Sequence, residues 1–500
     1  MIEVVLARAD KFPGETGVEE MSKQESTGYE VTAGGSTTPQ ELGEQPLAER
    51  GSKSSDAASA NTPTSVTRSN FAARVARTQL STGATLLVLE NHATATISLR
   101  GSLRAGSYFE PRDKPGLASI TADMLERGTR RRTKLQLAND LESVGAEIEF
   151  STDSFSIEVA GRALAKDLSL LINTLAETLR EPAFPAAELE KLKQQAIAAI
   201  QEQQANTRLR AYEKFSQLTY DPANPFYVHA GDALVKSLNS ITVEDVQRFY
   251  DERYGGRSLV LAVVGDVRAD EVQRLFAKAF DEFTGPRQSV EINVDDPEPP
   301  TETRREIVFL REKANVDVLL GASAPLRRAA GDYYAATLSN GALGQSTLSS
   351  RLGLQVRDRE GLTYGIGSRF RAPSLAAGPW YIAVSVNPTN VEKAIGSALA
   401  VLNDYVTNGM TAAELADEKS SAIGSFKVSL STNAGIAEAL WNAEFFELGL
   451  DYMDRFPELI GVVTLAEANA AIRKYFRPAQ LTIVIAGDYE ATPAGSVPIT

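Results

Sequence analysis

The chain has 500 residues, of which 43% are hydrophobic and 23% charged, and none is cysteine. This length is sufficient for two or more separate hydrophobic cores. A formal net charge of -14 disfavours nucleic-acid phosphates and anionic lipid as partners, and the lack of cysteine excludes a disulfide framework, a thiolate nucleophile and a cysteine metal cage in this chain.

The first part of the chain, residues 1–77, is rich in Ser, Thr, Gly, Glu and Ala and has almost no apolar periodicity. This composition predicts a disordered tail. Its first residues, MIEVVLARADKFPGE, lack the apolar core of roughly 7–15 residues that a secretory signal requires. As written, the sequence predicts a soluble protein without an export signal. The sequence leaves the compartment open: as written it favours the cytoplasm, and a wrongly assigned start would make a periplasmic location the alternative.

From about Thr78 onward, strand-like segments alternate with long amphipathic ones. ATLLVLE and ATISLRGSL are typical of strands, whereas LAKDLSLLINTLAETLRE and AAELEKLKQQAIAAIQEQQ have helical spacing. The longest apolar runs, 259–264 and 483–486, are far shorter than the roughly 20 residues of a membrane-spanning helix. We interpret both as buried strands, and we predict a mixed α+β architecture without a membrane span.

The second half of the chain repeats the first. The segment SITVEDVQRFYDERYGGRSLVLAVVGDV, ending at Val267, resembles VVTLAEANAAIRKYFRPAQLTIVIAGDY, ending at Tyr489, with a shift of 222 positions. The AAEL at Ala186 returns at Ala412, 226 positions later. A nearly constant shift favours an internal duplication over two similar segment endings by chance. The predicted units are an N-terminal domain (78–294), a linker (295–303), a C-terminal domain (304–490) and a tail (491–500).

The segment KPGLASITADMLERGTRRR, residues 114–132, predicts an amphipathic helix after a Pro-Gly start. Its apolar stripe consists of Leu117, Ile120, Met124 and Leu125. At about 100° per residue, the opposite side carries Ser119, Ala122, Asp123 and Glu126. We expect this second side to be a solvated polar face that points away from the core.

The pattern G-L-A-x-x-x-x-x-M-L-x-x-G-T in this segment resembles the zinc helix of the pitrilysin, insulinase and mitochondrial processing peptidase superfamily, whose five central positions read H-x-x-E-H. Those histidines bind one zinc ion, and the glutamate activates the attacking water. The matching positions here are Ser119, Ala122 and Asp123. The family's third ligand, a glutamate on a later helix, is matched by Ala198 or Ala199 in AIAAI. The resemblance therefore implies that zinc ligands and catalytic base are both missing.

The remaining metal-binding residue types do not replace that site. Asp123 is a single carboxylate, and without imidazole support it cannot hold zinc at useful affinity. The two histidines are His92, after a predicted strand, and His229, in a loop-like segment, 137 positions apart, so they form no local ligand pair. We predict that this chain holds no metal and no cofactor.

The C-terminal half contains LSNGALGQSTLSSRLGLQVRDREGLTYGIGSRF, which is similar to the family's C-terminal signature of a Gly-rich turn, S-S-R-L and R-x-x-x-G-L-x-Y. By this match, Arg357 and Tyr364 correspond to the pair that hydrogen-bonds the substrate backbone beside the scissile bond in active members. Both side chains are donors that can position a peptide carbonyl and stabilise an oxyanion. The structural alternative pairs Arg357 with Asp358 or Glu360 at the surface and packs Tyr364 in a strand.

The resemblance extends from about Thr78 to Tyr489 and implies two domains, each with a mixed, mostly antiparallel sheet flanked by helices. It also implies a function, that of the non-catalytic subunit of a heterodimeric zinc metalloendopeptidase that lines a peptide-degrading or presequence-processing chamber. The expected partner is a homologous subunit with an intact H-x-x-E-H motif and its zinc, and the expected substrate is unfolded peptide. The chain alone is expected to catalyse nothing.

Other function classes agree with the same residues. A purely structural subunit, similar to the core proteins of the respiratory bc complex, predicts that Arg357 and Tyr364 are dispensable. A peptide-binding homodimer predicts peptide affinity without cleavage. An autonomous hydrolase needs a nucleophile or metal cluster that two histidines and no cysteine do not supply.

Overall fold

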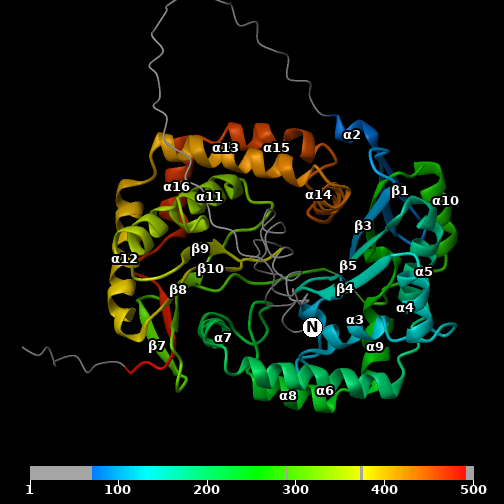
Figure 1. The fold of residues 1–500 in the computed structure, drawn as a ribbon, viewed down its shortest axis with the longest axis horizontal. Helices are drawn as coiled ribbons and strands as arrows, with labels where there is room; N and C mark the ends of the chain where they lie inside the picture. The colour runs from blue at the N-terminus through cyan, green and yellow to red at the C-terminus, as the bar shows by residue number, and fades with distance from the viewer. Residues whose placement is uncertain (1–69, 289–290, 372–374, 491–500) are drawn as a thin grey trace, which may run out of the picture.

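The computed structural model describes residues 70–288, 291–371 and 375–490, which form two α+β domains, each with one sheet flanked by helices (Figure 1). The predicted fold class is confirmed. Among the described residues, no helix combines the length and the apolar character needed to cross a bilayer.

Most of the first predicted tail, residues 1–69, and all of the second, residues 491–500, lie outside the described residues. The boundary of the first tail is wrong, however. Residues 71–77 belong to α2 (Phe71–Arg74) and β1 (Val75–Gln79). Ladder hydrogen bonds to the next strand hold β1, so its low apolar content does not prevent it from being an edge strand of the N-terminal sheet.

The N-terminal sheet has six strands in the order β1-β2-β6-β3-β5-β4. Its further strands are β2 (Thr85–Glu90), β3 (Thr96–Leu103), β4 (Glu147–Thr152), β5 (Ile157–Leu164) and β6 (Val260–Gly265). β2 and β6 are parallel, and every other neighbouring pair is antiparallel. The helices of this half are α3 (Leu117–Leu125), α4 (Lys134–Glu142), α5 (Leu168–Arg180), α6 (Ala186–Gln203), α7 (Thr207–Thr219), α8 (Gly231–Ser240), α9 (Val243–Arg253) and α10 (Ala269–Phe280).

The C-terminal sheet has five strands in the order β7-β11-β8-β10-β9. They are β7 (Arg304–Phe309), β8 (Val316–Ser323), β9 (Ile366–Phe370), β10 (Pro379–Val386) and β11 (Thr482–Gly487). Here β7 and β11 are the parallel pair. The helices are α11 (Tyr333–Asn340), α12 (Val391–Asn408), α13 (Ala412–Ser429), α14 (Asn433–Phe445), α15 (Tyr452–Gly461) and α16 (Leu465–Tyr475), with π-helical turns η5 (Gly341–Gln345) and η6 (Gly353–Arg359).

The two sheets repeat one topology, which confirms the internal duplication. Strands β2, β6, β3, β5 and β4 have the same order and the same single parallel pair as β7, β11, β8, β10 and β9. The helix that precedes the last strand of each copy, α9 or α16, starts at a Thr capping box, at Thr242 and at Thr464. The last strand of each copy ends at a glycine with positive φ, +151° at Gly265 and +149° at Gly487.

Each sheet is buried on both faces, as the continuous apolar strands predict. Side chains of a strand alternate between faces, so Leu86 and Val88 of β2 join the large core formed with α3 and α5. Leu87 and Leu89 point the other way and pack against Trp441 and its neighbours on α14. Helices are therefore required on both sides of the sheet.

The helix that covers the second face of each sheet comes from the other half of the chain. α14 packs on β3 and β6, and the Trp441 Nε1 donates a hydrogen bond to Ser102 Oγ at 2.8 Å. Conversely, α7 packs on β8 and β11, where the ring of Tyr212 lies 5.8 Å from that of Tyr381. Figure 1 shows α7 beside the C-terminal sheet and α14 beside β3. This reciprocal exchange joins the two domains into one unit.

Candidate functional site

The helix that resembles a zinc helix, α3, is anchored by a buried carboxylate. Glu110 accepts hydrogen bonds from the backbone N–H groups of Gly116, at 3.0 Å, and Ala118, at 2.7 Å. These groups belong to the start of α3, where N–H donors have no partner within the helix. Burial raises the pKa of the Glu110 carboxyl to about 7, although the two N–H bonds act in the opposite direction. Glu110 therefore serves the fold of α3.

The three positions that match H-x-x-E-H are partly absorbed into the core. Ser119 and Asp123 are half-buried, whereas Ala122 is 1% exposed and belongs to the core cluster around α3. The prediction that Ala122 lies on a solvated face is therefore wrong, because neighbouring elements cover this side of α3 as well. Burial raises the pKa of the Asp123 carboxyl to about 6, and nearby Arg127 opposes that shift.

The other candidate metal positions do not complete a site. α3 packs against α6, where Ala198 is exposed and Ala199 half-buried. His92 Nδ1 lies 2.6 Å from Asp266 Oδ1, and the His229 ring packs 5.1 Å from the Tyr227 ring. Within the described ranges, no group of three or more His, Cys, Asp or Glu residues could hold a metal ion. The residues present on α3 and α6 do not fit zinc.

In the C-terminal domain, Arg357 lies on η6, next to the loop that leads into β9. Its Nε donates to the backbone carbonyl oxygen of Tyr364 at 3.0 Å, and its guanidinium lies 5.9 Å from the centre of the Tyr364 ring. Its Nη1 donates to Asp358 Oδ1 at 2.6 Å. The structure thus brings together the two residues that the signature pairs, with Arg357 holding the backbone of the Tyr364 loop.

Tyr364 points into solvent. Its residue is 92% exposed, and within the described part of the chain its hydroxyl makes no hydrogen bond. The loop itself is ordered by Thr363, whose hydroxyl donates to the Ser385 carbonyl oxygen at 2.6 Å and accepts from the Gly365 N–H at 3.1 Å. Tyr364 is a wall of a hollow of about 300 Å³, and Arg208 of α7 forms another wall.

The alternative with a purely structural role for the pair has two parts, an ion pair of Arg357 with Asp358 or Glu360 and the packing of Tyr364 in a strand. Its first part agrees with the structure, because Arg357 does form an ion pair with Asp358. Its second part does not, because Tyr364 is exposed rather than packed in a strand. Glu360 contacts Gln355 and Ser397, at 2.6 and 2.9 Å. The tyrosine, more than the arginine, is the residue whose conformation the fold does not explain.

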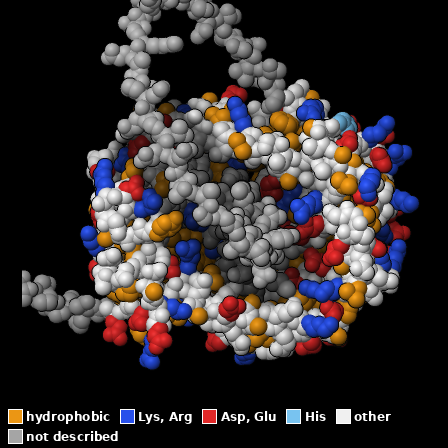
Figure 2. Space-filling model, in the orientation of Figure 1, with side chains coloured by type: hydrophobic (Ala, Val, Ile, Leu, Met, Phe, Trp, Pro, Cys, Tyr) orange, Lys and Arg blue, Asp and Glu red, His pale blue; other side chains and the backbone are white. Residues whose placement is uncertain are grey.

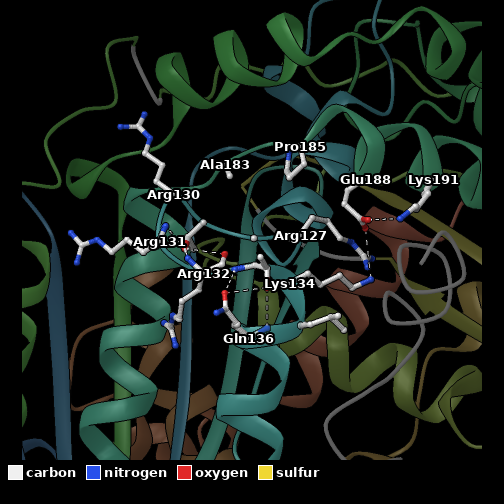
Figure 3. A pocket seen from close by; sticks show the side chains of 14 residues that line it. Arg127, Arg130, Arg131, Arg132, Lys134, Gln136, Ala183, Pro185, Glu188 and Lys191 are labelled. Carbon is white, nitrogen blue, oxygen red and sulfur yellow. Dashed lines mark hydrogen bonds and ion pairs between the residues drawn. The ribbon is translucent and has the colours of Figure 1, made fainter.

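A second hollow, of about 610 Å³, was not predicted. It lies where the turn after α3 meets the first turns of α4 and α6, and six Lys or Arg side chains line it together with one acid, Glu188 (Figure 3). The available signal was the run Arg130-Arg131-Arg132 in a chain of net charge -14. Its partners across the hollow, Lys191 among them, are distant in sequence and could not be inferred from that run.

Two models of known protein families match successive parts of this chain. Residues 86–224 match the family model described as Insulinase (Peptidase family M16). Residues 240–422 match the model described as Peptidase M16 inactive domain. The two matches include strands of both sheets but end before β11, and the second includes Arg357 and Tyr364.

Several individual proteins are similar over long stretches. The non-peptidase homolog YmxG of Helicobacter pylori is 23% identical over 400 residues, which cover 79% of this chain and 90% of that protein. The mitochondrial-processing peptidase subunit beta of Bos taurus is 26% identical over 190 residues, 38% of each chain. A crystal structure of the peptidase M16 inactive domain from Pseudomonas fluorescens superposes with a TM-score of 0.76 at 26% identity, covering 83% of this chain and 97% of that one.

Proposed function

Because the chain belongs to the M16 peptidase superfamily as a member without a catalytic zinc site, we propose that it is the non-catalytic subunit of a heterodimeric zinc metalloendopeptidase. In this proposal it pairs with a homologous subunit that carries zinc and an intact H-x-x-E-H motif. The two subunits enclose a chamber that degrades peptides or processes presequences. This chain contributes Arg357 and Tyr364 to anchor the substrate at the partner's zinc.

The observation that carries the proposal is the exposure of Tyr364. Burying a large aromatic ring normally stabilises a fold, yet this ring is 92% exposed on a loop whose backbone is held by Arg357 and Thr363. A rigid loop that presents a free phenol donor is suited to a contact outside the chain. An extended peptide that crosses the adjacent hollow would receive this donor on a backbone carbonyl.

Arg357 also has a nitrogen, Nη2, that could donate to the substrate backbone carbonyl. Its Nε and Nη1 are used by the Tyr364 carbonyl and Asp358, and Nη2 makes no hydrogen bond to the described residues. A zinc ion in the partner would polarise the scissile carbonyl and activate water. The role of Arg357 and Tyr364 is then to orient the peptide backbone and to stabilise negative charge as it develops on the carbonyl oxygen.

The test is reconstitution with a zinc-bearing M16 subunit and a fluorogenic unfolded peptide. We expect the chain alone to cleave nothing and to contain no stoichiometric zinc. In the reconstituted pair, Arg357→Ala and Tyr364→Phe should each lower kcat by about 10- to 100-fold, because each removes a donor to the reacting carbonyl. Arg359→Ala is the matched control, since Arg359 is on the same turn but bonds to Gln355. Peptide hydrolysis by the chain alone would refute the proposal, as would full activity of both variants.

One contact favours a purely structural subunit as a second candidate. The Arg357–Asp358 ion pair, at 2.6 Å, occupies part of the guanidinium and would persist without any substrate. In a structural subunit, both Arg357→Ala and Tyr364→Phe would leave the assembled complex fully active. The kcat measurement above therefore separates the two candidates.

A further inference from the structure

The unpredicted hollow beside α3 has a strongly cationic lining. Its cations come from the turn after α3, the start of α4 and the start of α6: Arg127, Arg130, Arg131, Arg132, Lys134 and Lys191. We call this lining the cationic hollow. Over the face in Figure 2, acidic and basic side chains are interspersed. A concentration of cations in one hollow is therefore unusual for a chain of net charge -14.

Two of these cations are paired with acids that do not belong to the lining of the hollow, Glu181 and Glu177. Arg131 pairs with Glu181 at 2.6 Å, and Arg132 pairs with Glu177 at 2.8 Å. The turn that carries them is closed by bridges from Gly128 to Thr133 and from Thr129 to Pro182. This turn is thus a built feature of the fold, and the two paired arginines belong to its framework.

The other cations retain an excess of positive charge. Lys134 and Lys191 share the single acid Glu188, at 3.9 and 2.6 Å. Arg130 makes no side-chain hydrogen bond or ion pair within the described ranges. The Nε of Arg127 is buried and has no hydrogen-bond partner among the described residues. The positive charge of Arg127 nevertheless adds to the excess in the hollow.

Two helix N-termini add to this field. The first turn of α4, from Thr133 to Gln136, lines the hollow, and so does Pro185, the N-cap of α6. Because helix N-termini carry partial positive charge, both favour an anion in the hollow. Thr133 and Gln136 already cap α4, whereas Pro185 has no side-chain acceptor for the first N–H groups of α6.

We infer that the cationic hollow binds an acidic segment of an extended peptide. This inference rests on the proposed function and adds a substrate preference to it. Figure 3 shows Arg130 pointing in a different direction from Lys134 and Lys191, so one compact anion would not reach all three. Successive carboxylates along an extended peptide would reach all three cations. Leu135 is 72% exposed at the hollow and offers an apolar contact that suits a peptide side chain but not an oligophosphate. Among the described residues, the lining contains no aromatic ring on which a nucleobase could stack.

The position of the hollow agrees with a peptide ligand. Arg127 lies one helical turn beyond Asp123, and the two side chains interact electrostatically. Glu188 and Lys191 lie on the same helix as Ala198, one of the positions that match the third zinc ligand. A peptide that passes the former zinc positions would therefore reach the hollow along α3 and α6.

The test uses the full chain and two labelled extended peptides, one with glutamate at alternate positions and one with glutamine in their place. At about 0.15 M salt, we expect the glutamate peptide to bind about tenfold more tightly by fluorescence anisotropy. Arg130→Glu should abolish that preference, and Arg130→Gln should weaken it. The control Arg473→Glu alters an exposed arginine on α16, outside the hollow, and should leave the preference unchanged.

Each contrary outcome has a distinct meaning. Equal binding of both peptides would overturn this inference and leave the proposed function intact. Binding of neither peptide would also overturn this inference, and the kcat of the reconstituted pair would then decide the proposed function separately. Binding of tripolyphosphate that is lost in Arg130→Glu, without a preference for the glutamate peptide, would make the hollow a site for another class of anion. A thermal melt of each variant establishes that it is folded, and because Arg130 is exposed we expect unchanged Tm.

Discussion

The zinc-helix region of the N-terminal domain and the Arg357–Tyr364 loop of the C-terminal domain differ in whether the residues that match the family motif are buried or exposed. At α3, the position of the catalytic glutamate is a buried alanine, and Glu110 uses its carboxylate to hold the helix start. At the loop, the tyrosine is exposed while its backbone is fixed. In α3 the matching position is filled by core packing, whereas the Tyr364 hydroxyl makes no hydrogen bond to the described residues. The comparison teaches that one half of a duplicated chain can lack the zinc-motif residues while the other half keeps the Arg-Tyr signature.

The largest expected effect tests whether core packing around α3 excludes a glutamate at position 122. Ala122→Glu introduces a carboxylate at a position that is 1% exposed and lies in the apolar core around α3. We expect the free energy of unfolding to fall by at least about 3 kcal/mol, measured by chemical denaturation. Ala198→Glu places the same change on the exposed side of α6 and should stay within about 0.5 kcal/mol of wild type. Equal stability of the two variants would contradict the burial of Ala122.

The second effect concerns the anchor of α3 and depends on pH. Because burial raises the pKa of Glu110 from 4.5 to about 7, the folded state binds this proton more tightly than the unfolded state. Stability should therefore decrease by up to about 3 kcal/mol as the pH rises from 4.5 to 7, and then level off. Glu110→Gln keeps an acceptor without the charge and should remove this part of the pH dependence, which denaturation across the pH range would measure.

A control separates the charge of Glu110 from its hydrogen bonds. Glu110→Ala leaves the N–H groups of Gly116 and Ala118 without their acceptor, so it should be less stable than Glu110→Gln at every pH. A pH profile of Glu110→Gln identical to that of wild type would show that this carboxyl does not titrate with folding.

A smaller effect is expected at the C-terminal loop. Arg357→Ala removes the 3.0 Å hydrogen bond to the Tyr364 carbonyl and should destabilise the fold by about 1 kcal/mol. Amide hydrogen exchange at Gly365 should accelerate, because the loop loses one of its two attachments. Unchanged exchange in this variant would mean that Thr363 alone orders the loop.

The smallest effect sharpens the comparison most directly. Tyr364→Phe removes a hydroxyl that has no partner in the described part of the chain, so stability should change by less than about 0.5 kcal/mol. The proposal nevertheless expects a clear loss of kcat in the reconstituted pair. A large loss of stability in this variant would instead assign Tyr364 to the fold.

The sequence determined the elements and their repetition. Apolar periodicity is a local property, so it predicted β2, β3, α5, α6 and the two buried strands β6 and β11. The repeated Thr and Gly-Asp positions predicted the duplication, which the shared strand order confirms. The motif around α3 likewise identified which catalytic residues are missing, because type and spacing are sufficient to recognise that absence.

Only the tertiary structure decided what surrounds these elements. The exchange of α7 and α14, the burial of Ala122 and the meeting of the Arg130 turn with Lys191 all depend on segments that are distant in sequence. Residues 71–77 resembled a tail because an edge strand receives its order from ladder bonds to β2 rather than from its own apolar pattern. The exposure of Tyr364 also came from the structure, since a signature names a residue but not the direction in which the fold points it.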